Sequence, residues 1–173
     1  MARKSSKNTF FLLAFALLIA ILLVTVMALN PLPHFIWNAS KSVPIGLYWI
    51  EFRQPSRGEI AVVKLEDWPQ LYAAERGYLP ENVWLLKPVM AVFPSTVCRF
   101  GNYVLINGKL VAKAKNIDRQ HRILPRWKGC LALKFGEVFL VARPKDSFDS
   151  RYFGVIKMAQ VAGVAHRLRF PFE

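Results

Sequence analysis

The chain has 173 residues, a formal net charge of +13 and a hydrophobic content of 54%. An apolar content this high excludes a disordered chain, because disordered chains are poor in apolar residues. The apolar residues are not spread over several long runs, which also excludes a protein with many membrane spans. The length allows one domain with an appendage and is too short for two full domains.

The first expected element is a membrane-spanning helix over residues 10–29, a run of twenty residues without a charged side chain. At 1.5 Å per residue this helix is about 30 Å long, which matches the hydrocarbon core of a bilayer. The preceding tail carries Arg3, Lys4 and Lys7. Positive charge beside a membrane span stays cytoplasmic. We therefore expect a cytoplasmic tail at 1–9, a transmembrane anchor at 10–29 and an extracytoplasmic domain at 30–173.

Two other interpretations of this run are weaker. If the run were a cleaved signal peptide, Val26-Met27-Ala28 would serve as its small-residue cleavage site. Its apolar region is usually about 7–15 residues long, however, and this run is longer. A buried helix of a soluble protein normally shows one polar face, which the run lacks. The uncleaved anchor is favoured.

Short apolar segments separated by turn signals follow, and they predict a mainly β domain. The expected strands are 46–52, 58–65, 83–92, 131–133, 138–142 and one or two within 155–165. Asn107-Gly108 predicts a hairpin between 103–106 and 109–111. The one helix expected in the domain is 67–77, with Asp67 as its cap. Pro88 inside a strand indicates an edge strand or a bulge.

A basic stretch occupies residues 109–128, with seven basic residues and one acid, Asp118. Such a stretch can bind nucleic acid or anionic lipid. The sequence shows no recognisable nucleic-acid motif and no interleaved aromatic residues of the kind that single-strand binders use. We favour a solvated hairpin or loop close to a membrane, and we expect no nucleic-acid partner.

The two cysteines, Cys98 and Cys130, lie in the part expected outside the cytoplasm. An even count in an oxidising compartment favours a disulfide. Two buried free thiols are the alternative, because the sequence does not supply the geometry that a disulfide needs. The cysteines form no CxxC motif, and the histidines are scattered. We therefore expect no metal site and no other cofactor.

Three polar places stand out: 38–48, Lys87, and 146–154. A serine hydroxyl is a weak nucleophile until a base takes its proton. A lysine is such a base only when neutral, and burial among apolar groups lowers its pKa. Leu85 and Val89 lie on the same strand face as Lys87 and favour its burial. Taken singly, the lysine also fits a solvent-exposed strand position, Ser42 fits an ordinary turn, and Asp149 and Arg151 fit a structural ion pair.

The segments NASKSVPIGLYW, LLKPVMAVFPSTV and DSFDSRYFG resemble the three boxes of the membrane-anchored signal peptidases of the Ser/Lys type, family S26. They are most similar to the TraF-type conjugative-transfer peptidases, whose first box has the form N-x-[ST]-x-S-x-P-x-G-L-Y. The resemblance implies a signal-peptidase-like, β-rich catalytic domain behind one N-terminal transmembrane helix. It also implies a serine endopeptidase.

The resemblance implies roles for six residues. Ser42 matches the nucleophile, Lys87 the general base, Ser40 an oxyanion-hole donor, Ser147 the serine that orients the lysine, and Asp149 and Arg151 a structural pair in which Asp149 assists catalysis. One departure follows the lysine. Ordinary leader peptidases have Arg and a Gly-Leu-Pro-Gly-Asp turn there, whereas this chain has Pro88 and the segment 92–96. The backbone after the lysine is therefore expected to differ.

The family resemblance further implies a pilin precursor as substrate, cleaved after small residues for conjugative transfer and type IV secretion. The location implied is the bacterial inner membrane, with the catalytic domain in the periplasm. In some members a peptide amine replaces water and gives a cyclic product. The alternatives are a general signal peptidase I and a non-catalytic anchored component of a secretion or pilus assembly. Nothing in the sequence indicates an oligomeric state.

Overall fold

The computed structural model describes residues 5–29 and 32–169. The chain forms two compact units, divided between Pro33 and His34. The first contains α1 (Ser5–Leu29), which begins five residues before the expected span. Among the described residues, α1 is the one helix long and apolar enough to cross a membrane. Positions 1–4 of the expected basic tail, with Arg3 and Lys4, lie outside the described residues.

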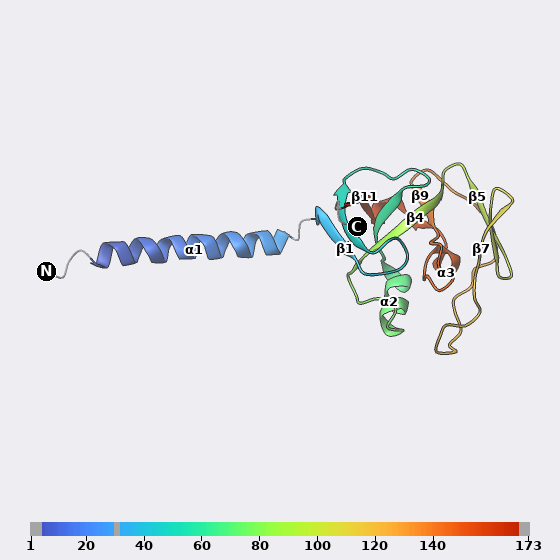
Figure 1. Ribbon diagram of the computed structural model, residues 1–173, viewed down its shortest axis with the longest axis horizontal. Coiled ribbons are helices and arrows are strands. Elements are labelled where there is room, and N and C mark those ends of the chain that lie inside the picture. Colours follow the sequence, from blue (N-terminus) through green and yellow to red (C-terminus); the bar gives the residue numbers. More distant parts are fainter. Residues whose placement is uncertain (1–4, 30–31, 170–173) are drawn as a thin grey trace. The chain divides into compact units, whose positions relative to one another are not determined.

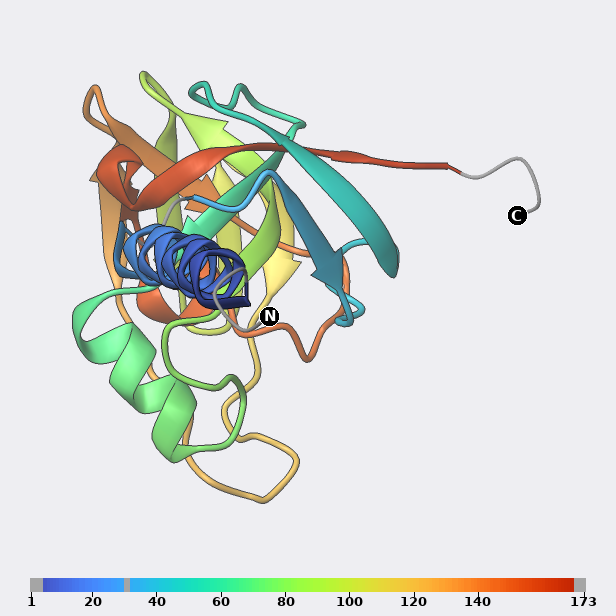
Figure 2. The same ribbon diagram turned by 90° about the vertical axis from the view of Figure 1, so that its left-hand side faces the viewer.

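The second unit is mainly β, as predicted, and contains two antiparallel sheets (Figure 1). The first sheet has the order β1 (Phe35–Asn38), β2 (Gly46–Glu51), β11 (Val161–Arg167), β3 (Ile60–Lys64), β4 (Trp84–Val92), β9 (Glu137–Leu140) and β10 (Ile156–Lys157). The second has the order β7 (Lys109–Lys113), β6 (Tyr103–Ile106), β5 (Thr96–Phe100) and β8 (Gly129–Ala132). The last strand, β11, pairs with β2 on one side and β3 on the other (Figure 2), so a C-terminal segment completes the first sheet.

The predicted helix is α2 (Asp67–Glu75). Beyond its end, Gly77 has a φ of 68°, and its N–H donates to the C=O of Ala74 at 3.0 Å. Glycine is common at this position because it adopts the left-handed conformation without steric cost. The expected cap was wrong. Glu66 occupies the N-cap position, no side chain caps the helix there, and Asp67 is the first helical residue.

The expectation of a single helix in this unit was also wrong. A short helix, α3 (Ser150–Phe153), begins within the third polar box, and a 3-10 turn, η1 (Met158–Gln160), separates β10 from β11. Asp149 is the N-cap of α3, and its side chain accepts a hydrogen bond from the N–H of Arg151. The segment DSFDSRYFG therefore contains the start of a helix.

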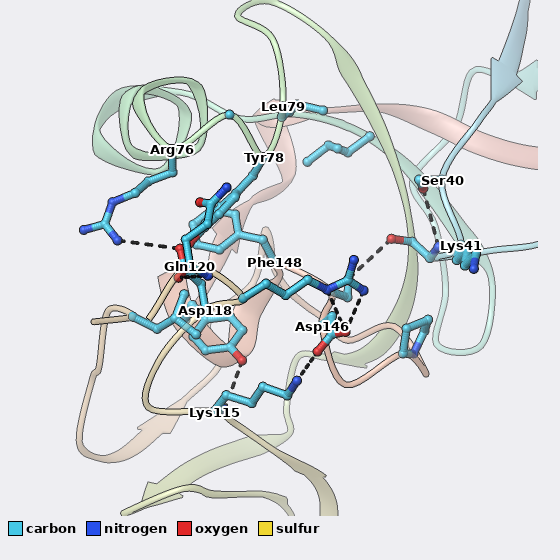
Figure 3. Close-up of a pocket in the computed structure, with 18 of the residues that line it drawn as sticks. Ser40, Lys41, Arg76, Tyr78, Leu79, Lys115, Asp118, Gln120, Asp146 and Phe148 are labelled. Carbon is cyan, nitrogen blue, oxygen red and sulfur yellow. Dashed lines mark hydrogen bonds and ion pairs between the residues drawn. The ribbon is translucent and has the colours of Figure 1, made fainter. Parts of the chain in front are cut away.

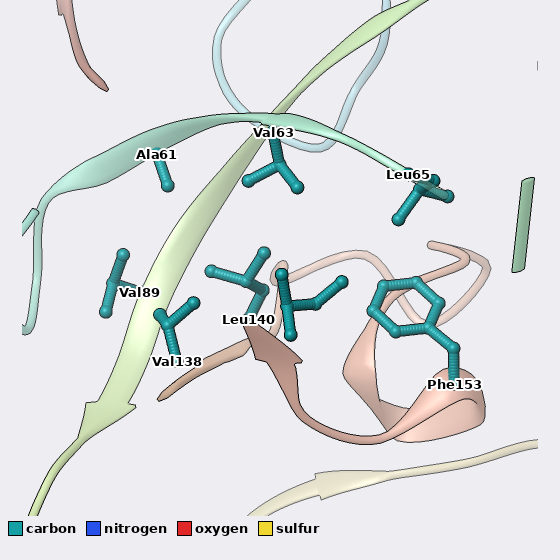
Figure 4. Close-up of a cluster of buried hydrophobic side chains, with 8 residues drawn as sticks. Ala61, Val63, Leu65, Val89, Val138, Leu140 and Phe153 are labelled. Atoms are coloured by element: carbon teal, nitrogen blue, oxygen red, sulfur yellow. The ribbon is translucent and has the colours of Figure 1, made fainter. Parts of the chain in front are cut away.

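The core lies on both faces of the first sheet, because β3 and β4 are central strands. Successive side chains of a strand point to opposite faces. Ala61 and Val63 therefore pack in one cluster with Val89 and Leu140 (Figure 4). Val62, between them, packs in a second cluster on the other face. Because β3 is covered on both faces, its apolar residues form a continuous run and do not alternate with polar ones.

Two turn predictions had different outcomes. The hairpin at Asn107-Gly108 is confirmed: both residues have positive φ, 48° and 76°, as a two-residue turn of this kind requires. Pro88, in contrast, does not mark an edge strand. β4 pairs with β3 and with β9, and an irregularity in register between Val89 and Ala91 shows that the bulge interpretation was the better one.

Cys98 on β5 lies directly opposite Cys130 on β8. The two form a disulfide, as expected, with an S–S distance of 2.06 Å. Strand β5 and strand β1 were not predicted from the sequence, and β5 supplies one half of this link. The disulfide fastens the edge strand β8 to its neighbour β5.

Candidate active site

Ser42, Lys87 and Ser147 come from three separate segments and meet at one point. Ser42 lies in the turn between β1 and β2, Lys87 on β4, and Ser147 in the loop before α3. The Nζ of Lys87 donates hydrogen bonds to the Oγ of Ser42 and to the Oγ of Ser147, each at 2.7 Å. The two hydroxyl oxygens lie 3.3 Å apart. The geometry matches a nucleophile, a base and a residue that orients the base.

Lys87 is buried, with 4% of its surface exposed, in the middle of the first sheet. Burial disfavours the charged ammonium and lowers its pKa to about 8. Asp149 raises this pKa and Arg151 lowers it, and both effects are smaller than that of burial. A fraction of the amine is therefore neutral near pH 7, and a neutral amine can accept the proton of Ser42.

The side chain of Asn38 holds the turn that carries Ser42. Its Nδ2 donates to the C=O groups of Ser40, Val43 and Pro44 at 2.8, 3.0 and 3.0 Å. Its Oδ1 accepts from the N–H and the hydroxyl of Ser40 at 3.1 and 2.9 Å. One buried amide thus fixes the backbone on both sides of Ser42. Asn38 is the first residue of the segment NASKSVPIGLYW, and its role was not predicted.

Ser40 has two partners in this turn. Its hydroxyl donates to Asn38, while its Oγ accepts a long hydrogen bond of 3.4 Å from the N–H of Ser42. The Ser40 hydroxyl and the Ser42 N–H are the two expected oxyanion donors. Both are engaged with each other or with Asn38, so an oxyanion role requires the Ser40 hydroxyl to rotate when substrate binds.

Asp149 and Arg151 form a buried pair, with 0% and 2% of their surfaces exposed. The Nε and Nη2 of Arg151 donate to the two carboxylate oxygens at 2.8 and 2.7 Å. Arg151 also donates to the C=O of Ser147 at 3.4 Å. Among the described residues, Asp149 has no hydrogen bond to Ser42 or to Lys87. The structure therefore places the pair behind Ser147, where it holds the loop, and Asp149 acts on Lys87 through its charge alone.

The dyad opens onto a cleft of about 660 Å³ (Figure 3). One wall is the segment 115–124 between β7 and β8, which we term the cleft loop. Another is an aromatic cluster around Phe148, which stacks on Tyr72 of α2 and Tyr152 of α3 at centroid distances of 5.6 and 5.9 Å. The residue between Ser147 and Asp149 thus ties the loop before α3 to α2.

In residues 5–29 and 32–169, no group of three or more His, Cys, Asp or Glu side chains could hold a metal ion.

The cleft loop was missed as part of the site, because its residues belong to the basic stretch that we expected to be solvated. Its signal in the sequence was the single acid Asp118 among seven basic residues.

The chain is similar to known proteins over most of its length. Residues 7–170 match the family described as signal peptidase, peptidase S26. Two plasmid transfer proteins TraF from Escherichia coli are 32% and 31% identical to this chain over 141 residues, which is 73% of this chain and 78% of each relative. A signal peptidase I from Enterococcus faecalis is 21% identical, with a TM-score of 0.40 over 66% of this chain and 98% of that one.

The family match covers both polar boxes, the lysine and the helix that precedes them. A family of serine peptidases needs an activated serine, and the contact between Lys87 and Ser42 provides one. The chain belongs to the peptidase S26 family of signal peptidases.

Proposed function

We propose that this protein is a membrane-anchored serine endopeptidase that processes a pilin precursor in plasmid conjugative transfer. The observation that carries the catalytic part is the 2.7 Å hydrogen bond between the buried Lys87 and Ser42. The similarity to the TraF plasmid transfer proteins supports the part that concerns conjugation. The pilin substrate follows from the resemblance of the three boxes to TraF-type peptidases.

Acylation begins with a neutral Lys87. The Oγ–H of Ser42 donates to the amine, which accepts the proton as the Oγ attacks the scissile carbonyl carbon. Ser147 keeps the amine in place through its own hydrogen bond to Lys87. The negative charge moves to the carbonyl oxygen, where the N–H of Ser42 and the hydroxyl of Ser40 are the candidate donors.

The collapse of this intermediate releases the first product. Lys87, now an ammonium, gives its proton to the leaving amine, and the C–N bond breaks. An ester between Ser42 and the remaining peptide is left, with Lys87 neutral again. A water molecule then loses a proton to Lys87 and attacks the ester carbonyl carbon, and Lys87 gives this proton to the Oγ of Ser42 as the C–O bond breaks. If the amino terminus of the same peptide attacks instead, the product is cyclic.

We also propose that α1 anchors the protein in the bacterial inner membrane, with the catalytic domain in the periplasm. Its length and composition support an anchor, and the basic residues before it support this orientation. Protease added to spheroplasts should digest the domain. Protection of the domain, with the amino terminus exposed, would contradict the proposed orientation.

The experiment that tests the activity mixes the full chain in detergent with candidate pilin precursors and weighs the products by mass spectrometry. Ser42→Ala should abolish cleavage. Lys87→Arg should nearly abolish it, because a guanidinium does not lose its proton. Matched controls are Ser56→Ala, an exposed serine, and Lys64→Arg on the neighbouring strand. A cyclic product is lighter than the hydrolysed one by one water molecule.

Two results would contradict the proposal. Cleavage by Ser42→Ala would exclude the serine mechanism and favour a non-catalytic assembly component. Cleavage of unrelated exported precursors as fast as pilin precursors would favour a general signal peptidase.

A further inference from the structure

The cleft carries an excess of positive charge that the proton transfers do not use. Among the described residues that line it, five are basic and two are acidic. The basic residues are Lys41, Arg76, Lys87, Lys115 and Arg119, and the acidic ones are Asp118 and Asp146. Lys87 belongs to the dyad, so four further cations face the space where a substrate must lie.

Each acidic residue of the cleft is shared by two cations. Asp146 forms ion pairs with Lys115 and with Arg119, the latter at 2.7 Å (Figure 3). These hydrogen bonds, that of Lys115 first, lower the pKa of Asp146 to about 2. Asp118 pairs with Arg122 at 2.7 Å and with Arg76 at 3.9 Å. Each set of one acid and two cations therefore has a net charge of +1.

Lys41 adds a cation with no such compensation. It lies in the cleft between Ser40 and Ser42, and its side chain is exposed. Among the described residues it has no ion-pair or hydrogen-bond partner. It follows Ser40 and precedes the nucleophile, so its backbone is held by the Asn38 network while its ammonium stays free.

Arg119 lies on the cleft loop, with 82% of its side chain exposed. Its Nε and Nη2 bind Asp146, and the two N–H groups on Nη1 stay available for a second carboxylate. The loop itself is held in place by α2. The hydroxyl of Tyr72 donates to the C=O of Ile123 at 2.8 Å, and Arg122 donates to the C=O of Arg76 at 3.0 Å. Arg119 is therefore presented by a fixed loop.

We propose that the cleft selects substrates that carry a carboxylate side chain close to the scissile bond, and that Lys41 and Arg119 bind this carboxylate. The inference rests on the proposed function, because it describes the substrate of the same site. A cleft lined by one sign of charge concentrates ligands of the opposite sign. Such pairing also steers association and selects among partners.

The test uses the full chain in a neutral detergent and pairs of internally quenched peptides that differ by a single Glu-to-Gln exchange near a small-residue cleavage site. The Glu peptides should be cleaved with a kcat/KM about fivefold higher than their Gln partners, and added salt should reduce this ratio. Lys41→Ala and Arg119→Ala should each lower the ratio. Arg119→Glu should bring it below one.

The matched control is Arg57→Glu, which makes the same change in net charge at an exposed position that does not line the cleft. It should leave the ratio unchanged. Equal cleavage of Glu and Gln peptides by the unaltered protein would overturn the inference while the proposed function stands. Equal effects of Arg57→Glu and Arg119→Glu would also overturn it, since they would show a general effect of charge.

A separate arm covers failure of the peptidase assay. If neither the peptides nor the pilin precursors are cleaved, the proposed function fails, and binding is measured by fluorescence anisotropy on the Ser42→Ala variant. Tighter binding of the Glu peptide, lost in Arg119→Glu, supports the charge preference even then. Equal binding of both peptides contradicts it.

Discussion

The Oγ of Ser147 accepts a hydrogen bond from the Nζ of Lys87 at 2.7 Å, across a separation of 60 residues in the chain. The same amine bonds Ser42. The amine of Lys87 thus has two partners: Ser147, which takes no part in the reaction, and Ser42, which reacts. Because Ser147 is itself buried and its C=O accepts from Arg151, the amine stays aimed at Ser42 when the proton moves.

The rate of cleavage should rise with pH. The pKa of Lys87 is lowered to about 8, so roughly a tenth of the enzyme carries the neutral amine at pH 7. We expect kcat/KM to increase about tenfold per pH unit below pH 8 and to level off above it. The measurement is kcat/KM for one precursor from about pH 6 to about pH 10. A profile without a step near pH 8 would contradict the role of Lys87.

Replacing Lys87 by Met should stabilise the protein while it destroys activity. The lysine titrates near 10.5 in the unfolded chain and near 8 in the folded one. Below pH 8 both states are protonated and the folded state buries a charge. This penalty disappears as the pH rises from 8 to 10.5. Below pH 8 the buried charge therefore lowers the free energy of unfolding by on the order of 3 kcal/mol.

The measurement for Lys87→Met is thermal unfolding at several pH values. The variant should have a higher Tm than the unaltered protein at pH 7, and the difference should shrink toward pH 10.5. Lys64→Met, on the neighbouring strand, is the control and should show no such trend. A Tm difference independent of pH would mean that packing, and not the buried charge, sets the effect.

Asp149→Asn separates a positioning role from a catalytic one. Asp149 raises the pKa of Lys87, so its removal should move the acid limb of the pH profile to lower pH. Breaking its buried pair with Arg151 should also cost about 3–5 kcal/mol of stability. Loss of activity at every pH without a shift of the limb would instead indicate direct participation of Asp149 in proton transfer. Glu59→Gln, which breaks an exposed pair with Arg53, is the control and should change stability little.

Asn38→Asp keeps the shape of the side chain and removes its N–H donors. A carboxylate oxygen would then face three carbonyl oxygens in the turn that carries Ser42. Each unsatisfied buried group costs about 1–3 kcal/mol. We expect a lower Tm and a large fall in kcat, measured on the same precursor. Asn82→Asp, at an exposed position, is the control. Unchanged kcat would show that the turn does not depend on Asn38.

The sequence was sufficient to predict what depends on local pattern. The burial of Lys87 followed from its apolar neighbours, and the hairpin followed from Asn107-Gly108. The functions of Asn38 and Asp118 did not follow, because their partners are set by how a turn closes and by contacts between distant segments. Of the two interpretations of Pro88, the edge strand was wrong. The C=O of Pro88 accepts a hydrogen bond from the N–H of Val141 at 3.2 Å, so the strand pairs on that side.

The hydrogen bonds from Asn38 all end within its own turn, at Ser40, Val43 and Pro44. The cleft loop is held by other residues, through Asp118 and α2. Among the described residues, the turn of Ser42 is held by Asn38, Lys87 and Ser147, whereas the cleft loop is held by Tyr72, Asp118 and Asp146. The recognition that we propose for the cleft loop can therefore change while the dyad keeps its contacts, and exchanging residues 115–124 with those of a relative is the experiment that would redirect it.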